Sequence, residues 1–265
     1  MELPAPYNEC ENILQARERD LWLCALFAPS PQRPHLMALY AFAHEIARVA
    51  DLVRDPMPGE IRLQWWREAL MGEREGEMLA HPLAAAIRET ILRHRLPAQA
   101  LFDLIDARTF DLYHDPMADR AQLAAYCGAT HGAVTRLACL ILAAPGDDPG
   151  GANACGHAGV ALGVTAILRS YAWHHSRGRA FIPADALGRG DAFAEMRALA
   201  REHRALAMKA LDALAPAVRK LLAPAFLPLA LVEPYLRQME KRGYDPATSA
   251  VEVPQWRRQW ALWRA

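Results

Sequence analysis

Apolar residues recur every three or four positions along most of this chain, and the apolar–polar alternation typical of a strand is nearly absent. Alanine, leucine and arginine dominate while β-branched residues are sparse, and both features favour helix. Proline and glycine interrupt the pattern and leave short connections. The pattern predicts helices over residues 8–27, 32–54, 58–76, 81–95, 97–113, 119–144, 151–174, 191–214, 216–223, 226–242 and 253–263. We therefore expect an all-α fold.

The chain is also expected to form one domain. No low-complexity linker or internal repeat divides its 265 residues, a length that suits one large helical domain. With 53% apolar and 23% charged residues, the composition is that of a soluble globular protein. We expect a single domain over residues 1–265.

Charge and hydropathy narrow the classes of partner. The 30 basic and 30 acidic side chains cancel, so no overall field attracts the protein to nucleic acid or to anionic lipid, and only a local basic patch would do so. The N-terminal residues are acidic and lack an apolar run, so we expect no secretory signal. No uninterrupted apolar window reaches the roughly 18 residues of a spanning helix. We expect a cytoplasmic protein, and contact with the periphery of the inner membrane stays open.

Five cysteines are scattered along the chain without a CxxC pair, a distribution that fits a reducing compartment and buried thiols. They are Cys10, Cys24, Cys127, Cys139 and Cys155.

The last predicted helix carries Trp256, Trp260 and Trp263 at near-helical spacing. Two interpretations stay open. The rings pack this helix onto the core, or they are exposed at a membrane or partner surface.

Residues 167–183, ILRSYAWHHSRGRAFIP, read as a helix that runs into an arginine-rich loop and closes on a proline. This segment resembles the second signature of the squalene/phytoene synthases. The residues that keep the family frame are Ile167, Leu168, Arg169, Gly178, Arg179 and Pro183. Ser170 and His174 stand where the family has two metal-binding aspartates.

The first signature of that family resembles residues 40–51, YAFAHEIARVAD. Counted from Tyr40, the two adjacent family aspartates become Ala47 and Arg48, and only Asp51 survives. An arginine at the position of a Mg²⁺ ligand brings positive charge to a site that collects cations.

The family chemistry needs those carboxylates. Ionising an allylic diphosphate requires Mg²⁺ to neutralise the leaving group, and Mg²⁺ takes hard oxygen ligands. By the resemblance, a family glutamine and asparagine also become Gly163 and Ala166, and a diphosphate-holding Ser-x-Ser-Phe run becomes residues 18–21, ERDL. We therefore expect an isoprenoid-synthase-like helical bundle around a central cavity, without catalytic residues or metal. Mg²⁺ would be expected only with residual synthase activity.

One branch of the family is more similar than the synthases. The segments FAHEIARV, IRLQWWREAL, GVALGVTAILRS and SRGRAFIP resemble the mitochondrial respiratory complex I assembly factor and its bacterial relatives, which also lack the aspartate motifs. The resemblance implies a non-catalytic accessory role, with complex I assembly intermediates as partners. Two alternatives stay open: a transferase that binds a prenyl diphosphate through arginines, and a lipid-binding scaffold at a membrane surface.

The candidate site is the mouth of the former cavity, where an isoprenoid or lipid ligand would bind. Its expected residues are Tyr40, Phe42, Arg48, Asp51, Arg169, Ser170, His174 and Arg179. Arginines hold phosphate or carboxylate in a forked geometry. The alternative is that they form ion pairs with Asp51, Glu45, Asp106 or Asp111.

Two further features allow more than one interpretation. A transition-metal site could draw on His44, Glu45, Asp51, His174 and His175, although nothing fixes a ligand set. Gly159 and Gly163, four residues apart on one predicted helix, allow close helix approach or space for a tunnel, and the two interpretations are compatible.

Overall fold

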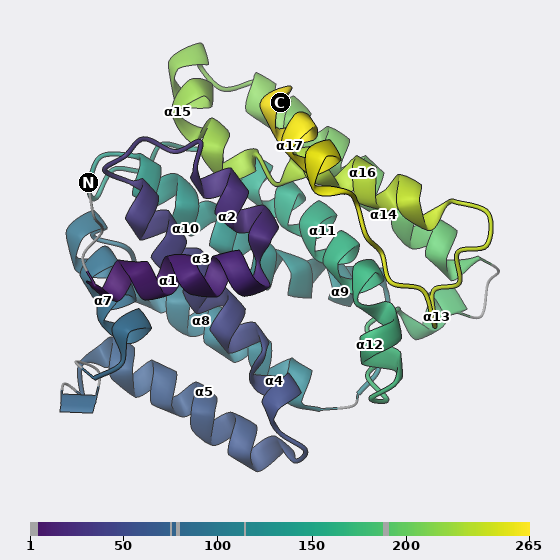
Figure 1. Ribbon diagram of the computed structural model, residues 1–265, viewed down its shortest axis with the longest axis horizontal. Helices are drawn as coiled ribbons and strands as arrows, with labels where there is room; N and C mark the ends of the chain where they lie inside the picture. Colours follow the sequence, from purple (N-terminus) through teal and green to yellow (C-terminus); the bar gives the residue numbers. More distant parts are fainter. Residues whose placement is uncertain (1–4, 75, 78–79, 114, 188–190) are drawn as a thin grey trace. The chain divides into compact units, whose positions relative to one another are not determined.

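The computed structural model describes residues 5–74, 76–77, 80–113, 115–187 and 191–265. These residues form helices joined by short turns, and none of them lies in a strand (Figure 1). The all-α fold expected from the sequence is confirmed. The chain divides into two compact units, Met1–Tyr113 with Arg136–Gly150, and His114–Thr135 with Gly151–Ala265, and each is described on its own. The single domain expected from the sequence stays a prediction.

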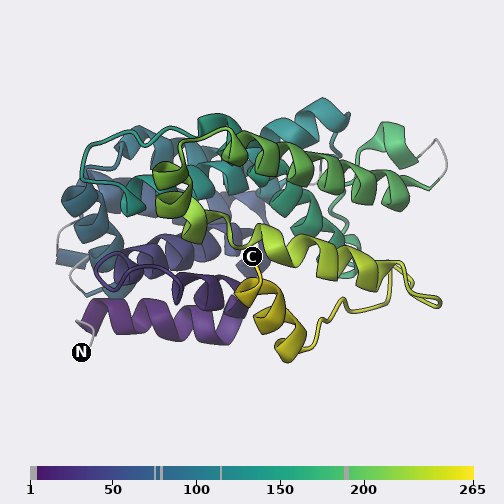
Figure 2. The same ribbon diagram turned by 90° about the horizontal axis from the view of Figure 1, so that it is seen from above.

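The first unit is built around α3. Its helices are α1 (Ala5–Arg17), α2 (Arg19–Ala25), α3 (Arg33–Ala47), α4 (Val49–Leu52), α5 (Pro56–Met71), α7 (Pro82–His94), α8 (Ala98–Thr109) and the short η1 (Phe110–Leu112), with most of α10 (Ala133–Leu142). Helices α1, α3 and α7 pack against one another, and α5 packs along α8 (Figure 2). Residues 35–42 are buried on every side of α3, as expected of a helix that is apolar all round.

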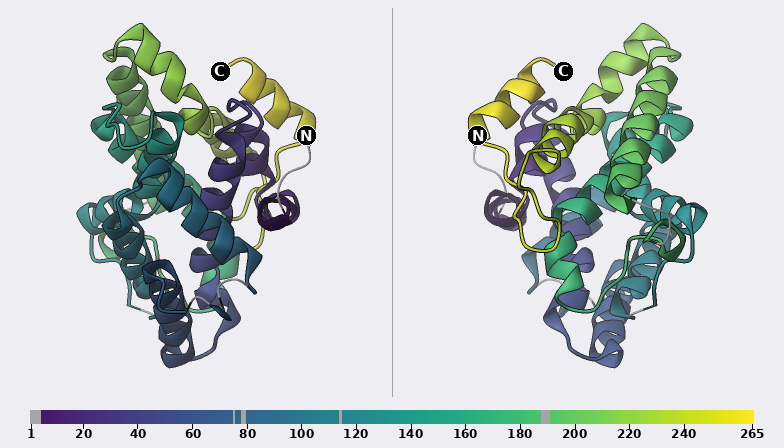
Figure 3. Two further views of the ribbon diagram at one scale, coloured as in Figure 1. Left: turned by 90° about the vertical axis from the view of Figure 1, so that its left-hand side faces the viewer. Right: turned by 90° about the vertical axis from the view of Figure 1, so that its right-hand side faces the viewer.

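The second unit is built around α11. Its helices are α9 (Arg120–Cys127), the π-helix η2 (Gly128–Gly132), α11 (Ala152–Arg169), α12 (Tyr171–His175), α13 (Ala184–Leu187), α14 (Ala192–Asp212), α15 (Pro216–Phe226), α16 (Leu229–Met239) and α17 (Gln255–Trp263). Helix α11 packs along α14 and also contacts η2 and α16. An irregular stretch after α16 leads the chain back, so that α17 packs against α16 (Figure 3).

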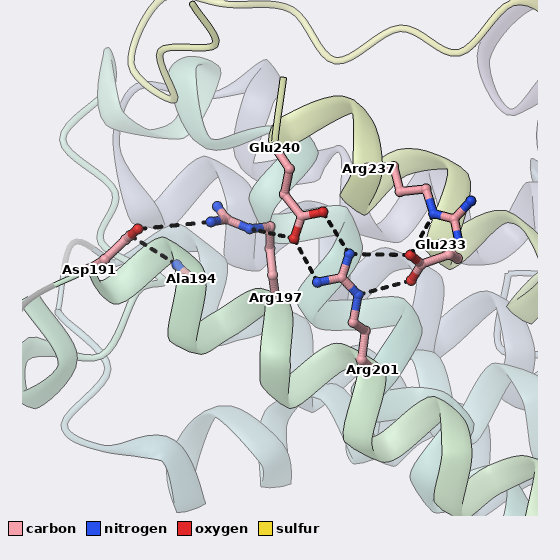
Figure 4. Close-up of polar contacts among 7 residues, drawn as sticks. All are labelled: Asp191, Ala194, Arg197, Arg201, Glu233, Arg237 and Glu240. Atoms are coloured by element: carbon pink, nitrogen blue, oxygen red, sulfur yellow. Dashed lines mark hydrogen bonds and ion pairs between the residues drawn. The ribbon is translucent and has the colours of Figure 1, made fainter. Parts of the chain in front are cut away.

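A network of charged side chains joins α14 to α16 (Figure 4). The Arg201 guanidinium donates to both carboxylate oxygens of Glu233, at 2.9 and 3.3 Å, and to both of Glu240, at 2.6 and 2.9 Å. Arg237 also donates to Glu233, at 2.8 Å. Burial alone would raise the pKa of Glu233, but these hydrogen bonds hold that pKa below its ordinary value. The network therefore fixes how α16 lies on α14.

Two predicted helices are interrupted at residues of the family signatures. The helix expected over residues 32–54 breaks at Arg48, where the backbone bends between α3 and α4. The helix expected over residues 151–174 breaks at Ser170, between α11 and α12. Both residues stand where the resemblance places a family aspartate, so each altered signature also lies at a helix junction.

Two other predicted helices differ from the structure. The helix expected over residues 8–27 ends at Arg17, because Glu18 has a non-helical backbone, and α2 follows. The helix expected over residues 119–144 contains the π-helix η2. A π-turn carries one extra residue relative to the α-helix, and periodicity over a long window does not reveal it.

Candidate functional site

The residues of the first signature divide between core and surface. Tyr40 and Phe42 are buried, with 2% and 0% of their surface exposed, and the Phe42 ring meets the edge of Trp66 at 5.3 Å between centroids. Burial raises the pKa of Tyr40 well above its ordinary value, and nearby Cys24 and Cys139 add to the effect. Tyr40 and Phe42 thus serve the packing of the first unit.

The polar side chains of the same signature pair with one another. Arg48 Nη1 donates to Glu45 Oε1 at 3.0 Å, with both side chains partly exposed. His44 Nδ1 lies 3.0 Å from Oε1 of Glu18, the residue that separates α1 from α2. The expected ion pair between Arg48 and Glu45 is confirmed, and each of these carboxylates faces a basic group.

Asp51, the surviving family aspartate, lies on the short helix α4 and is exposed. Ala47 and Arg48 stand where the resemblance places the two adjacent family aspartates, and neither side chain offers an oxygen ligand.

The second signature forms the C-terminal end of α11 and the loop after it. The Arg169 guanidinium lies over the Tyr235 ring of α16, 3.7 Å from the centroid. Ser170 joins α11 to α12, and its backbone carbonyl accepts a hydrogen bond from the His174 backbone N–H at 3.0 Å. Cation–π packing of the kind seen at Arg169 fixes the position of the guanidinium.

The arginine-rich loop folds back on α12. The backbone N–H of Arg179 donates to the His174 carbonyl at 3.0 Å, and Gly178 takes the left-handed conformation that this turn requires, with φ at 71°. Arg177 stacks over the Trp173 ring, 3.1 Å from its centroid, and the His174 ring meets Phe181 at 4.8 Å between centroids.

Backbone pairing fixes the end of this loop. Met117 donates its N–H to the Ala180 carbonyl at 3.2 Å and accepts from the Ala184 N–H at 3.0 Å. Nothing in the residue types at these positions signals this pairing, because only backbone groups take part.

The structure therefore brings Ser170, His174 and Arg179 together in the second unit, with Arg169 one residue before them. Tyr40, Phe42, Arg48 and Asp51 belong to the first unit. Assembly of all eight into one ligand pocket stays a prediction.

The ligand chemistry of Mg²⁺ does not fit the residues present. Ala47, Arg48, Ser170 and His174 include no carboxylate, and Mg²⁺ selects carboxylate and phosphate oxygens. Within the described part of the chain, no group of three or more His, Cys, Asp or Glu side chains is placed to hold a metal ion. The donor set thus lacks what a diphosphate-ionising metal cluster would require.

The two glycines of α11 are sites of close helix packing. A Cβ on Gly159 would lie 2.4 Å from the Gly132 nitrogen, and a Cβ on Gly163 would lie 2.6 Å from Cys127 Sγ and 3.1 Å from His131 Nδ1. Close approach, one of the two interpretations open from the sequence, is confirmed. A glutamine at 163, as the resemblance expects of a synthase, would displace both Cys127 and His131.

The fold matches that of solved isoprenoid synthases. A dehydrosqualene synthase superposes with a TM-score of 0.79 at 17% identity, covering 98% of this chain and 94% of that one. The squalene synthase HpnC from Alicyclobacillus acidocaldarius superposes with a TM-score of 0.71 at 20% identity, covering 92% and 98%. These likenesses define the class of protein by its fold, an all-helical isoprenoid synthase fold.

A family model described as squalene/phytoene synthase matches residues 14–264. The chain belongs to the squalene/phytoene synthase family.

Curated relatives fall into two groups. NADH dehydrogenase (ubiquinone) complex I, assembly factor 6, of Mus musculus is 28% identical over 183 residues, 69% of this chain and 54% of that protein. The Bos taurus counterpart is 29% identical over 66% of this chain and 52% of its own length. Presqualene diphosphate synthase of Rhodopseudomonas palustris is 30% identical over 160 residues, 60% of this chain and 56% of that protein. The chain thus spans about half the length of these three curated relatives.

Proposed function

We propose that this protein is a non-catalytic member of the squalene/phytoene synthase family that acts as an accessory or assembly factor for respiratory complex I. The observation that carries the proposal is the Arg48–Glu45 ion pair at 3.0 Å, at a position where the resemblance places a Mg²⁺ ligand. A guanidinium there pairs with the Glu45 carboxylate and offers no oxygen ligand to the cations that diphosphate ionisation needs. The protein acts without a bound metal.

The second signature supports the same proposal. Ser170 and His174 replace the other pair of aspartates, and the close contact at Gly163 leaves no room for the family glutamine. A protein that kept its turnover would need another source of positive charge for the leaving group at these positions.

The names of the relatives support a proposal for the partner. Mammalian proteins named complex I assembly factor 6 match about two thirds of this chain. We accordingly propose complex I assembly intermediates as partners, met at the cytoplasmic periphery of the inner membrane. No helix in the described part of the chain has the length and apolarity needed to cross a bilayer.

Deletion of the gene in its source organism tests this function. We expect membranes of the deletion strain to lose NADH:ubiquinone oxidoreductase activity and assembled complex I on native gels, while succinate dehydrogenase activity stays unchanged as the control. Expression of the wild-type chain should restore both. A deletion strain with a normal amount of active complex I would refute the assembly role.

A transferase is the second candidate, because relatives named presqualene diphosphate synthase and phytoene synthase also match. Arg169 and Arg179 could neutralise diphosphate charge in place of metal. Calorimetric titration with farnesyl and geranylgeranyl diphosphate, with and without Mg²⁺, followed by product analysis, separates the two candidates. We expect no condensed product, and Mg²⁺-dependent binding with such a product would establish the transferase instead.

A further inference from the structure

Helix α17 turns an aromatic stripe outward. Trp256, Trp260 and Trp263 are 63%, 54% and 70% exposed, and their spacing of four and three residues places them along one helix face. Leu262, only 2% exposed, lies on a different face of α17, which packs against α16. The interpretation in which the three rings pack the helix onto the core is therefore wrong, because Leu262 does that packing instead.

Positive charge accompanies the stripe. The Arg257 guanidinium lies 5.1 Å from the Trp256 ring centroid, and that of Arg264 lies 5.7 Å from the Trp260 centroid. Helical spacing places both arginines on the same flank of the stripe. The sequence has three arginines and no acidic residue from 253 to 265, so the side chains of this segment carry net positive charge.

The chemistry of this face fits a lipid surface. Tryptophan rings concentrate at the boundary between headgroups and acyl chains, where an apolar body and a polar N–H are both accommodated. Arginine binds phosphate through its forked donors, and basic residues near a membrane are attracted to anionic lipid. A helix with aromatic residues on one face and basic residues beside them is typical of a helix lying in the membrane interface.

The size of the face argues against a protein occupant. Fully buried tryptophan side chains bury about 150–250 Å² each, and these three are 63%, 54% and 70% exposed, so the stripe offers roughly 400 Å². A stable protein interface needs about 800 Å² from each partner. A membrane needs no such area, because attraction between arginines and anionic headgroups adds to ring insertion.

We propose that α17 docks this protein on an anionic lipid surface, with the Trp256–Trp260–Trp263 stripe inserted at the headgroup level and Arg257 and Arg264 bound to lipid phosphate. The nine residues of α17 span about 14 Å, less than half of the roughly 30 Å hydrocarbon core, so the helix lies along the surface.

Flotation of the purified protein with vesicles tests the proposal. One set of vesicles is phosphatidylcholine alone, and the other is phosphatidylcholine mixed with phosphatidylglycerol. We expect the wild-type protein to float mainly with the anionic set. The variant Trp256→Gln/Trp260→Gln/Trp263→Gln should bind at least about tenfold more weakly, since it loses all the inserted rings.

A second variant separates charge from insertion. Arg257→Gln/Arg264→Gln should weaken binding to anionic vesicles by about thirtyfold, because each arginine contributes about 1 kcal/mol, and leave the weak binding to neutral vesicles unchanged.

Leu92→Gln is the matched control for the tryptophan variant, because Leu92 is 70% exposed, like Trp263, but lies outside α17. This control should float like the wild type.

Three outcomes would overturn the proposal: wild-type protein that floats with neither set, a tryptophan variant that floats as well as wild type, or a dimer that the tryptophan variant abolishes. Light scattering over a range of concentrations detects the dimer and would assign the stripe to a second copy of the chain. Because the assay contains only protein and lipid, its result does not depend on a role in complex I assembly.

Discussion

At the scale of single residues, His35 occupies the most constrained polar position in the first unit. It is 5% exposed, and its Nδ1 lies 3.0 Å from Thr90 Oγ1 and 3.1 Å from the Tyr7 hydroxyl. Thr90 uses its own proton on the Ala86 carbonyl at 2.8 Å, so it accepts a hydrogen bond from an Nδ1–H of His35. The neighbouring His94 ring lies 4.6 Å away between centroids.

Burial, together with the adjacent His94 and Arg93, lowers the pKa of His35 to about 4. In the unfolded chain a histidine titrates near 6.5. Between these values the unfolded chain binds a proton that the folded protein does not. We expect the free energy of unfolding to fall as the pH is lowered from about 6.5 to about 4, by roughly 3 kcal/mol from this residue.

Urea unfolding at a series of pH values measures this slope. His35→Gln removes the titration while keeping an amide N–H donor, and should flatten part of the acid slope. His94 and His203, whose pKa values burial also lowers, contribute to the slope in the same direction. An unchanged slope in the His35→Gln variant would show that the acid sensitivity arises elsewhere.

The lack of metal ligands at the two signatures could be predicted from the sequence, because residue identity alone shows that a carboxylate is missing. That Ala47 and Ser170 cannot replace aspartates requires no coordinates. The pairing of His44 with Glu18 could not be predicted, since the contact joins residues 26 positions apart through a helix break. The outward direction of the tryptophan stripe was one of two open interpretations, because a short helix with apolar residues on two faces does not show which face is covered.

At the scale of elements, α11 and η2 come into close contact because the residues that meet there are glycines, which have no side chain. Gly159 and Gly132 approach so closely that backbone meets backbone, and backbone cannot rotate away as a side chain can. Gly159, Gly163 and the small residues of the GATHG segment are the sequence signals for this contact, and they do not reveal the π-turn.

Gly159→Ala should lower the free energy of unfolding by about 2 kcal/mol or more. The cost of overpacking at a rigid contact is larger than the free energy gained from the higher helix propensity of alanine. Gly156→Ala is the matched control on the same helix. A Cβ there meets nothing within 4 Å, so this variant should raise the free energy of unfolding by about 0.5–1 kcal/mol. Denaturant titration of both proteins checks the prediction, and two variants of equal stability would contradict the close contact.

The charged network between α14 and α16 makes a second prediction at this scale. A double-mutant cycle with Arg201→Gln and Glu233→Gln should give a coupling energy of about 1 kcal/mol that falls with added salt. The Arg219–Asp212 pair, 3.0 Å apart and more exposed, is the control and should give about 0–0.5 kcal/mol. Equal coupling in the two cycles would mean that the forked geometry of Arg201 adds nothing.

At the scale of the whole molecule, the family fold is kept while the synthase signatures are altered. The all-helical architecture could be predicted because apolar periodicity persists through nearly every element. The residues that differ from the synthase pattern are spread over both signatures and over the packing of α11, so we expect that a few substitutions would not create synthase activity.

The quadruple variant Ala47→Asp, Arg48→Asp, Ser170→Asp and His174→Asp restores the expected carboxylates. We expect it to produce no measurable condensed product from farnesyl diphosphate and Mg²⁺, because Gly163 and Ala166 still depart from the synthase pattern. Product analysis by chromatography, with the wild-type chain as the control, decides the matter. Robust turnover would show that carboxylates alone separate this protein from a synthase.

All five cysteine side chains are buried, and burial raises the pKa of Cys10 to about 12. Cys10, Cys24 and Cys139 belong to the first unit, and Cys127 and Cys155 belong to the second. An alkylating reagent should therefore modify each thiol only when its surroundings open. The order in which the five positions become labelled would thus record, without any introduced probe, whether the two halves of the molecule open together or one before the other.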